Sequence, residues 1–478
     1  MRGAATMLQE WENHIVSTIE THRIPGLASG ISSNGKVIAA MGFGFRDQEQ
    51  QLPATEHTTF GIASITKTVT ALAIMMLQES GHLSVEDMVT KWLPEIKLPQ
   101  QYESSIRIKH LLNHTSGIPN LTLYYRMMVN SLRQDNNYRK AERLPFNPFR
   151  VQQVISFDQF IELFNTSVYE WYGPPGINYS YSNEGYMLLD QIISRVSGLS
   201  YTEYVSSQIL DPLGMIHTTF HHDDAAGVPE LTSIYYSMPL RKWRHVLKKK
   251  TIITRAKAWI SSGCIYGHGH LHSSVSDMLA FGELFYQGGV SRGVRLVKSE
   301  TIEEMITGKY GVSKQKWSNG LTLVGHSGGQ KGISSDLYIA VEAKVAVVAL
   351  ANIAQAPVWD VTLSGVNAAL GNHLFDLPIV REPFTESNAE ALATKLIGDY
   401  LCPKIGKLRI YQDQGRLVAK IQGIKGLFIP KFNITVRGCD HLQLWKFPAG
   451  ILFGEQEEVI GFALGPGYLF HLVSRHSH

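Results

Sequence analysis

Residues 60–67 read Phe60-Gly61-Ile62-Ala63-Ser64-Ile65-Thr66-Lys67, and the apolar stretch after them is typical of a helix. Because residues i and i+3 lie on one face of a helix, the Lys67 amine is expected within hydrogen-bonding reach of the Ser64 hydroxyl. A serine hydroxyl becomes a good nucleophile only when a neighbouring base takes its proton, and a desolvated lysine can be that base. Ser64 is also expected in the first turn, where free N–H groups and the helix dipole favour a developing anion. The stretch therefore predicts a nucleophile beside its base.

The pattern Ser-x-x-Lys is weak by itself, because the chain contains it three times. Ser33 and Lys36 enclose an Asn-Gly pair, and Ser313 and Lys316 lie in a polar stretch, so we interpret both as solvated turns. Only the copy at Ser64 opens an apolar helical stretch. Further motifs are needed to decide between catalysis and an ordinary helix start.

A second motif, Tyr181-Ser182-Asn183, lies before an apolar helix expected over residues 187–196. A nearby ammonium would favour the phenolate of Tyr181 and make it a plausible base. The carboxamide of Asn183 is suited to holding Lys67 or a substrate amide. The alternatives are a packing aromatic for Tyr181 and a helix N-cap for Asn183.

The third motif is Gly325-His326-Ser327-Gly328-Gly329, followed by apolar segments expected as strands near residues 337–340 and 345–351. Small residues such as Gly328 and Gly329 would let a substrate lie along a strand edge and take backbone hydrogen bonds. A histidine beside glycines is also common in ordinary turns. The order and spacing of the three motifs together indicate a catalytic site.

In this order the motifs resemble those of the serine β-lactamase and penicillin-binding-protein superfamily. More narrowly they resemble its class C-like branch, which includes D-aminopeptidases, alkaline D-peptidases and esterases. Supporting matches lie at residues 24–44, 111–117 and 276–281, and the resemblance spans about residues 10–375. It implies an α+β fold, with an antiparallel sheet flanked by helices, a helical lobe, and the active site between them.

The resemblance also implies roles for the motif residues. Ser64 would be the acylated nucleophile, and Lys67 and Tyr181 would share the general acid/base work. The N–H groups of Ser64 and Gly329 would form the oxyanion hole, and Asn183 and His326 would orient the substrate. His114, in the 111–117 match, is read as structural.

Departures from the family pattern narrow the expected activity. The Ser-Asp-Asn motif and the deacylating glutamate of class A β-lactamases have no counterpart at a matching place. His326 stands where many relatives carry lysine, and a mostly neutral imidazole is a weak anchor for a substrate carboxylate. We therefore expect a Ser64 acyl-enzyme that hydrolyses short peptides or small amides. A carboxylesterase or a weak β-lactamase comes next, and a non-catalytic scaffold is the alternative of another class.

The composition of the chain sets outer limits. Its 478 residues, 44% hydrophobic and 18% charged, suit a globular protein of two domains. The net charge of +3 gives no reason to expect a nucleic acid partner. Residues 241–257 carry eight Lys or Arg. We interpret this segment as a solvated face, or as a basic rim that attracts anionic substrates or a membrane surface. The apolar runs are too short to span a bilayer. Residues 8–20 are typical of an amphipathic helix and not of a signal peptide, so we expect a cytoplasmic location unless a signal was trimmed away.

Neither a cofactor nor a metal is expected. The three cysteines suggest no disulfide framework. His268, His270 and His272 stand at alternate positions, so on a strand they would share a face. Since no fourth ligand is evident, a structural role or a place in the wall of the site is the better interpretation.

The composition near residues 378–387 turns to Pro, Arg, Glu, Thr and Ser, which predicts a linker. Short alternating strands with glycine-containing turns follow it. We therefore predict a β-lactamase-like hydrolase domain over residues 1–377 and a small all-β barrel over residues 388–478, similar to the lipocalin-like modules of some relatives. The barrel would add stability, make contacts in a homo-oligomer, or limit substrate size as a lid.

Overall fold

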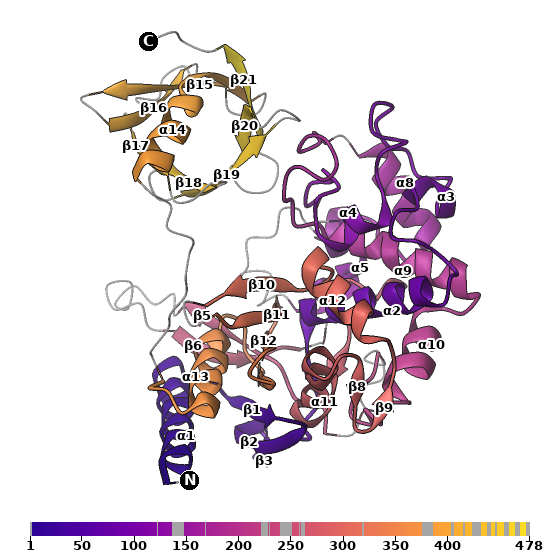
Figure 1. Cartoon of the computed structure of the whole chain (residues 1–478), viewed down its shortest axis with the longest axis vertical. Coiled ribbons are helices and arrows are strands. Elements are labelled where there is room, and N and C mark those ends of the chain that lie inside the picture. Colours follow the sequence, from indigo (N-terminus) through magenta and orange to yellow (C-terminus); the bar gives the residue numbers. More distant parts are fainter. Residues whose placement is uncertain are drawn as a thin grey trace.

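The computed structural model describes residues 2–374 and 386–474, apart from a set of internal gaps. These gaps are residues 122, 136–147, 168, 221–227, 229, 240–250, 258, 260–262, 318–319, 403–405, 414–415, 423–431, 437–440, 445–446, 454–457 and 464–468. Figure 1 shows a sheet with helices packed on it, a helical lobe beside that sheet, and a barrel near the C-terminus.

The large sheet has seven strands in the order β10-β11-β12-β13-β1-β2-β3, and every neighbouring pair is antiparallel. Asn34 and Gly35, with φ values of 51° and 77°, form the turn of the first hairpin, as the Asn-Gly pair predicts. In chain order the strands are β1 (Gly26–Ser33), β2 (Lys36–Asp47), β3 (Leu52–Pro53), β10 (Ser313–Lys316), β11 (Thr322–Gln330), β12 (Ile333–Ala340) and β13 (Val345–Ala351).

Helices cover both faces of this sheet because its central strands are apolar on both sides. Alternate residues of β13 pack into two separate cores, Val347 in one and Val348 in the other. The N-terminal helix α1 (Arg2–His22) lies with α13 (Val358–Leu370) on one face, and α11 (Val275–Tyr286) covers the other. The expected N-terminal helix is thus confirmed, with Trp11 fully buried and its indole N–H donating to Val361 O at 2.9 Å.

The helical lobe is built around α2 (Thr66–Glu79), which is buried nearly all round and packs against α9 (Asn183–Ser197). Two short strands, β4 (Phe60–Gly61) and β7 (His272–Ser273), pair just before α2 and α11 begin. The other helices and helical turns before β13 in the described part of the chain are η1 (Ala63–Ile65), α3 (Val89–Trp92), α4 (Ile108–Leu112), α5 (Tyr124–Met127), α6 (Val129–Gln134), η2 (Pro148–Arg150), α8 (Phe157–Thr166), α10 (Tyr201–Val205), η3 (Ser206–Leu210) and α12 (Ser299–Gly308).

The polar stretch Ser313–Lys316 is the edge strand β10 rather than a solvated turn, and edge strands often carry polar and lysine residues. The basic segment 241–257 includes β6 (Thr251–Arg255), which pairs with β5 (Tyr235–Pro239), whereas its residues 241–250 lie outside the described residues. The chain also has a small hairpin of β8 (Val290–Ser291) and β9 (Val294–Arg295).

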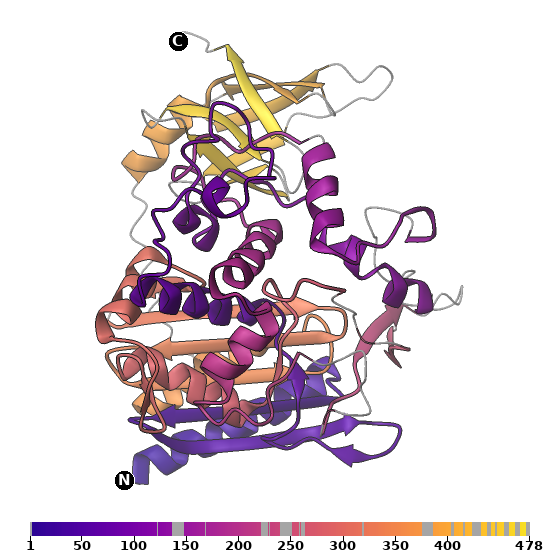
Figure 2. The same cartoon turned by 90° about the vertical axis from the view of Figure 1, so that its right-hand side faces the viewer.

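Eight strands near the C-terminus close into a barrel, which Figure 2 places at the end of the molecule opposite the N-terminus. A helix, α14 (Glu386–Leu396), precedes them and begins inside the expected linker. The strands are β14 (Gly398–Cys402), β15 (Gly406–Asp413), β16 (Arg416–Gln422), β17 (Phe432–Val436), β18 (His441–Leu444), β19 (Phe447–Phe453), β20 (Val459–Ala463) and β21 (Leu469–Ser474). The division into domains at 377 and 388 and the likeness to lipocalins stay predictions.

In the described part of the chain, none of the helices combines the length and the apolar character needed to cross a membrane. The expected cytoplasmic location stays a prediction.

Candidate active site

Ser64 lies in the turn η1, between strand β4 and helix α2. Ala63, just before it, has a φ of 45°, a left-handed conformation that costs a non-glycine residue free energy. Side chains hold this turn in place: the Thr66 hydroxyl donates to Ala63 O at 2.7 Å, and the Ser335 hydroxyl donates to Ile62 O at 2.7 Å. The partly exposed Ser64 side chain is therefore presented by a rigid turn on the core of the sheet.

The amine of Lys67 is the centre of the site. Its Nζ lies 3.2 Å from Ser64 Oγ and 2.8 Å from Asn183 Oδ1, and it also contacts the carbonyl oxygen of His268. Lys67 is fully buried, and this desolvation lowers its pKa to about 7, although the nearby Glu184 opposes the shift. The structure thus brings together three of the predicted residues, with a lysine that is substantially neutral at physiological pH.

The Tyr181 hydroxyl hydrogen-bonds the side chain of Ser64, and its ring lies 5.0 Å from Lys67 Nζ. Burial raises the pKa of Tyr181 above its usual value of 10, and this desolvation outweighs the hydrogen bond from Ser64. The phenolate expected from the sequence is therefore not supported. Tyr181 is instead a protonated phenol, placed to donate a proton close to the nucleophile.

Helix α9 positions Asn183, which is its first residue rather than its N-cap. Ser182 is the N-cap, and its hydroxyl accepts from Gly185 N at 3.2 Å. Glu184 follows with a fully buried carboxyl group that accepts from Leu123 N at 2.8 Å. This bond ties the start of α9 to the segment that carries helix α5.

His114 supports the Tyr181 loop, in agreement with its reading as a structural residue. Its ring lies 4.3 Å from the ring of Tyr181, and its Nδ1 accepts from Ser182 N at 3.2 Å. Burial lowers the pKa of His114 well below its usual value, so the ring is neutral and can accept this bond.

Strand β11 borders the site along its third motif. Its pairing with β10 stops at Gly325, so the stretch from His326 to Gln330 pairs with β12 on one side and with no described strand on the other. A Cβ at Gly328 would lie 2.4 Å from Ile62 O, so this glycine lets the strand approach the turn before Ser64. A Cβ at Gly329 would meet nothing within 4 Å, so the side of the strand on which that Cβ would lie is open.

His326 lies beside Tyr181, with the two ring centres 6.2 Å apart. His326 keeps partial contact with solvent, but its ring is enclosed. This enclosure is the main cause that lowers the pKa of His326 to about 4, and the nearby charge of Lys67 is a second, smaller cause. Its Nδ1 lies 2.6 Å from Ser327 O. The imidazole is therefore neutral at pH 7, as the sequence predicts.

A cavity of about 120 Å³ opens beside Ser64. Asn183 and Gly329 line it close to the nucleophile, whereas Tyr181 and His326 do not line it. Its other walls come from helices α5 and α6, the segment before β7 and the end of β11, and include Tyr124, Tyr125, Met128, Leu132, His268, Gly269, His270, Gln330 and Lys331. The described residues of the segment 120–157 thus contribute to this cavity.

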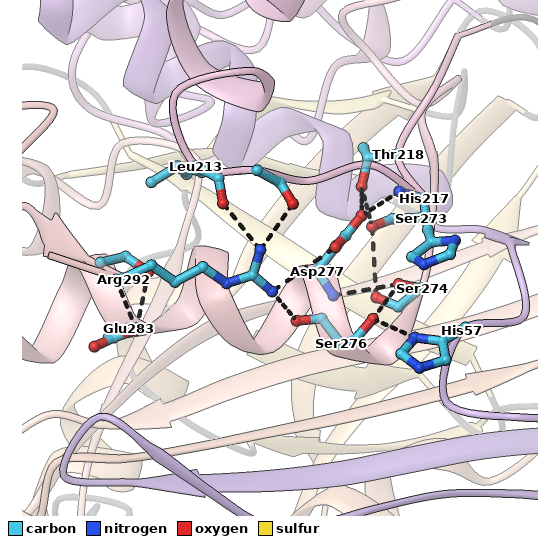
Figure 3. A network of polar contacts seen from close by, with 12 residues as sticks. His57, Leu213, His217, Thr218, Ser273, Ser274, Ser276, Asp277, Glu283 and Arg292 are labelled. Carbon is cyan, nitrogen blue, oxygen red and sulfur yellow. Dashed lines mark hydrogen bonds and ion pairs between the residues drawn. The ribbon is translucent and has the colours of Figure 1, made fainter. Parts of the chain in front are cut away.

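A polar network holds the end of β7 and the start of α11, as Figure 3 shows. The buried carboxylate of Asp277 accepts from His217 N at 2.7 Å and from the Thr218 hydroxyl at 2.9 Å. The Thr218 and Ser273 hydroxyls lie 2.8 Å apart, and the Ser274 hydroxyl caps helix α11 by accepting from Asp277 N. Since Ser273 belongs to β7, this network fixes the strand that follows His268 and His270.

Sequence reasoning assigned no role to several residues of the site. Glu184 adjoins the second motif, but its buried carboxyl group accepts a hydrogen bond from Leu123 N, which is distant in the sequence. Lys331 forms a fully buried ion pair of 3.0 Å with Asp135, a residue far away in the sequence. For the alternating histidines the sequence left a structural role or a place in the wall of the site open, and the structure places His268 and His270 in the wall. Within the described chain the structure contains no cluster of potential metal ligands.

Comparison with known proteins gives the family of the chain. The Beta-lactamase family model matches residues 11–364. Penicillin-binding protein 4* of Bacillus subtilis (strain 168) is 26% identical over 442 residues, covering 87% of this chain and 89% of that protein. The octameric penicillin-binding protein homologue from Pyrococcus abyssi superimposes with a TM-score of 0.64 and 27% identity, covering 97% of this chain and 99% of the other.

The D-amino acid amidase from Ochrobactrum anthropi SV3, solved with L-phenylalanine amide, shares the fold with a TM-score of 0.56 and 20% identity, over 76% of this chain and 97% of its own. The predicted superfamily and α+β fold are thereby confirmed. The chain belongs to the beta-lactamase family and is a serine hydrolase of that superfamily.

Proposed function

We propose that this serine hydrolase forms an acyl-enzyme on Ser64 and cleaves short peptides or small amides. The observation that carries the proposal is the fully buried amine of Lys67, 3.2 Å from Ser64 Oγ, with a pKa lowered to about 7. A lysine that is partly neutral at pH 7 can take the proton of the serine hydroxyl.

In the proposed mechanism, Ser64 Oγ attacks the substrate carbonyl carbon while its proton passes to Lys67 Nζ. The N–H groups of Ser64 and Gly329 stabilise the oxyanion of the tetrahedral intermediate. Tyr181 then donates its proton to the leaving nitrogen as the carbon–nitrogen bond breaks, and the Lys67 ammonium restores the phenol. Water hydrolyses the resulting ester by the same groups in reverse, and Asn183 holds both Lys67 and the substrate.

The experiment that tests this function is a hydrolysis screen of L- and D-aminoacyl anilides, p-nitrophenyl esters and nitrocefin. It is paired with labelling by a fluorophosphonate probe, which reacts with activated serines. We expect labelling that disappears in Ser64→Ala and a preference for aminoacyl amides. Intact protein that takes up no probe and turns over no substrate would instead support the non-catalytic scaffold.

The pH dependence of acylation follows from the pKa of Lys67. Because the neutral amine is the base, kcat/KM rises with pH through about 7 and then levels off. At pH 6 it should lie about tenfold below the plateau. The pKa of His326, about 4, lies below this range. A pH–rate profile with an ester substrate measures this rise, and a midpoint near 10 would contradict the lowered pKa that lets Lys67 act as the base at pH 7.

The neutral His326 also favours peptides and amides over β-lactams as substrates, because β-lactams carry a carboxylate. A lysine at this position would supply a permanent cation for a substrate carboxylate. We expect His326→Lys to raise kcat/KM for nitrocefin about tenfold relative to an uncharged ester. His326→Gln, which adds no charge, is the matched control. An unchanged ratio in folded, active His326→Lys would remove His326 from substrate selection.

We also propose that the chain assembles into a homo-oligomer. The similar protein from Pyrococcus abyssi is octameric, and its chain is covered at 99% by this one, barrel region included. Analytical ultracentrifugation measures the state directly, and a monomer at micromolar concentration would contradict the proposal.

A further inference from the structure

The cavity beside Ser64 lies on the acyl side of the reaction, an assignment that rests on the proposed function. Tyr181 delivers the proton to the leaving group, so the leaving group lies toward Tyr181 and His326. Neither of these residues lines the cavity, whereas Asn183 and Gly329 do. The cavity therefore receives the side chain of the residue whose carbonyl carbon is attacked.

The size of the cavity restricts that side chain. The cavity volume of about 120 Å³ is well below the roughly 300–1,000 Å³ of pockets that enclose a drug-sized ligand. It therefore accepts one side chain of small to medium size rather than a further residue of a peptide. Tyr124, Tyr125, Met128 and Leu132 give it an aromatic and apolar side.

His268 gives the cavity a polar side. Its side chain is buried, with 4% of the residue exposed, and within the described chain neither ring nitrogen has a hydrogen-bond partner. Burial lowers the pKa of His268 well below its usual value, so the ring is neutral and offers one N–H donor and one nitrogen acceptor. Leaving a buried donor and a buried acceptor unpaired costs free energy, so such a pair is unusual unless a ligand hydrogen-bonds with it.

The backbone holds this imidazole in place. The carbonyl oxygen of His268 accepts from Lys67 Nζ, and Gly267 N donates to the buried Asp190 at 2.8 Å. On the other side, the ring of His268 lies 4.7 Å from that of His270 and 6.1 Å from that of Tyr124. The donor and acceptor are therefore fixed before substrate binds, which is what a selective site requires.

The charge near the cavity is already balanced. Lys331 lines the cavity, but its ammonium pairs with Asp135 at 3.0 Å, and both side chains are fully buried. Asp135 also accepts from the Tyr236 hydroxyl and from Lys257 N, each at 3.0 Å. A charged substrate side chain would lose its hydration here without gaining an unpaired counter-ion.

We propose that His268 is the specificity-determining residue of this cavity, and that it selects substrates whose acyl side chain is uncharged and ends in a hydrogen-bonding group. A carboxamide meets both requirements, because it carries no charge and can either donate to the unprotonated ring nitrogen or accept from the ring N–H. An apolar side chain of the same shape leaves both nitrogens unpaired.

Asparagine, leucine and aspartate provide the test, because their side chains share one branched shape and differ in polarity and charge. We expect wild-type enzyme to hydrolyse the asparaginyl anilide at least tenfold faster, by kcat/KM, than the leucyl and aspartyl anilides of the same configuration. His268→Leu should remove this preference, and His268→Gln, which keeps a donor and an acceptor, should retain part of it. Preference for leucine or aspartate in wild type, or an unchanged ratio in His268→Leu, would overturn the proposal.

His272→Leu is the matched control. His272 belongs to the same alternating series and is buried, but it does not line the cavity, so its variant should keep the wild-type ratio. Equal loss of the preference in His272→Leu would mean that the ratio reports packing of the segment and not contact with His268.

A binding measurement separates this inference from the proposed function. Ser64→Ala cannot form an acyl-enzyme, so calorimetry on it compares asparagine and leucine methylamides without turnover. Absence of Ser64-dependent hydrolysis would refute the proposed function, while tighter binding of the asparagine methylamide, lost in Ser64→Ala/His268→Leu, would still support the pocket. Equal affinities in both backgrounds would refute the pocket even in an active hydrolase.

Discussion

Ser64→Ala and Lys67→Ala should each lower kcat on the order of 10³-fold or more, and the double variant should lose little beyond either single one. The two groups serve one step, because Lys67 Nζ takes the proton of Ser64 Oγ from 3.2 Å away. Removing either partner abolishes that step, so the second replacement has almost nothing left to remove. Single-turnover kinetics of the three variants on one anilide measures the effect.

The control for these three variants is another Ser-x-x-Lys pair, Ser313 and Lys316, on the edge of the sheet. Ser313→Ala and Lys316→Ala repeat the same substitutions at the same spacing on strand β10, outside the site. They should leave kcat near the wild-type value. Losses that multiply in the Ser64/Lys67 double variant would show that the two residues act independently, and the shared proton transfer would then be wrong.

Tyr181→Phe should lower kcat/KM for anilides roughly 10²- to 10⁴-fold, the range that general acid catalysis contributes. The substitution removes only the hydroxyl, while the ring contact with His114 at 4.3 Å remains. Because the phenol protonates the leaving nitrogen, the loss should shrink with p-nitrophenyl esters, whose leaving group departs without a proton. Comparing the two substrate types in one variant therefore measures the acid role separately from positioning.

Tyr179→Phe removes a hydroxyl two residues upstream in the same loop, from a residue that is 62% exposed. It should leave both substrates nearly unaffected. Near-full activity of Tyr181→Phe on anilides would make Tyr181 a packing residue and would require another proton donor.

The sequence predicts those parts of the site that depend on local periodicity. The spacing of Ser64 and Lys67 on one helical turn is of this kind, and so is the hairpin at Asn34-Gly35. The protonation state of Tyr181 could not be predicted, because it depends on burial by segments far away in the chain. The pair of Asp135 and Lys331 has no sequence signal at all, since 3.0 Å contacts between distant residues arise only from the tertiary fold.

The prediction of a solvated turn at Ser313–Lys316 is wrong because it too depends on contacts between distant parts of the chain. A polar stretch with Lys, Ser and Gly is typical of turns, but an edge strand exposed to solvent has the same composition. Its identity as β10 is decided by pairing with the apolar start of β11. The alternating histidines are a different case. Their spacing predicts a shared face on a strand, but it does not distinguish His268 and His270, which line the cavity, from His272, which does not.

The buried amine of Lys67 also affects the conformational stability of the protein. In the native state its pKa is about 7, whereas in the unfolded chain it returns to about 10.5. Between these values the unfolded chain binds the additional proton, so the free energy of unfolding rises as the pH is raised from about 7 to about 10. At neutral pH the lysine thus destabilises the fold by an amount on the order of a few kcal/mol. Selection for a reactive serine and selection for a heat-resistant fold act in opposite directions on this one nitrogen atom.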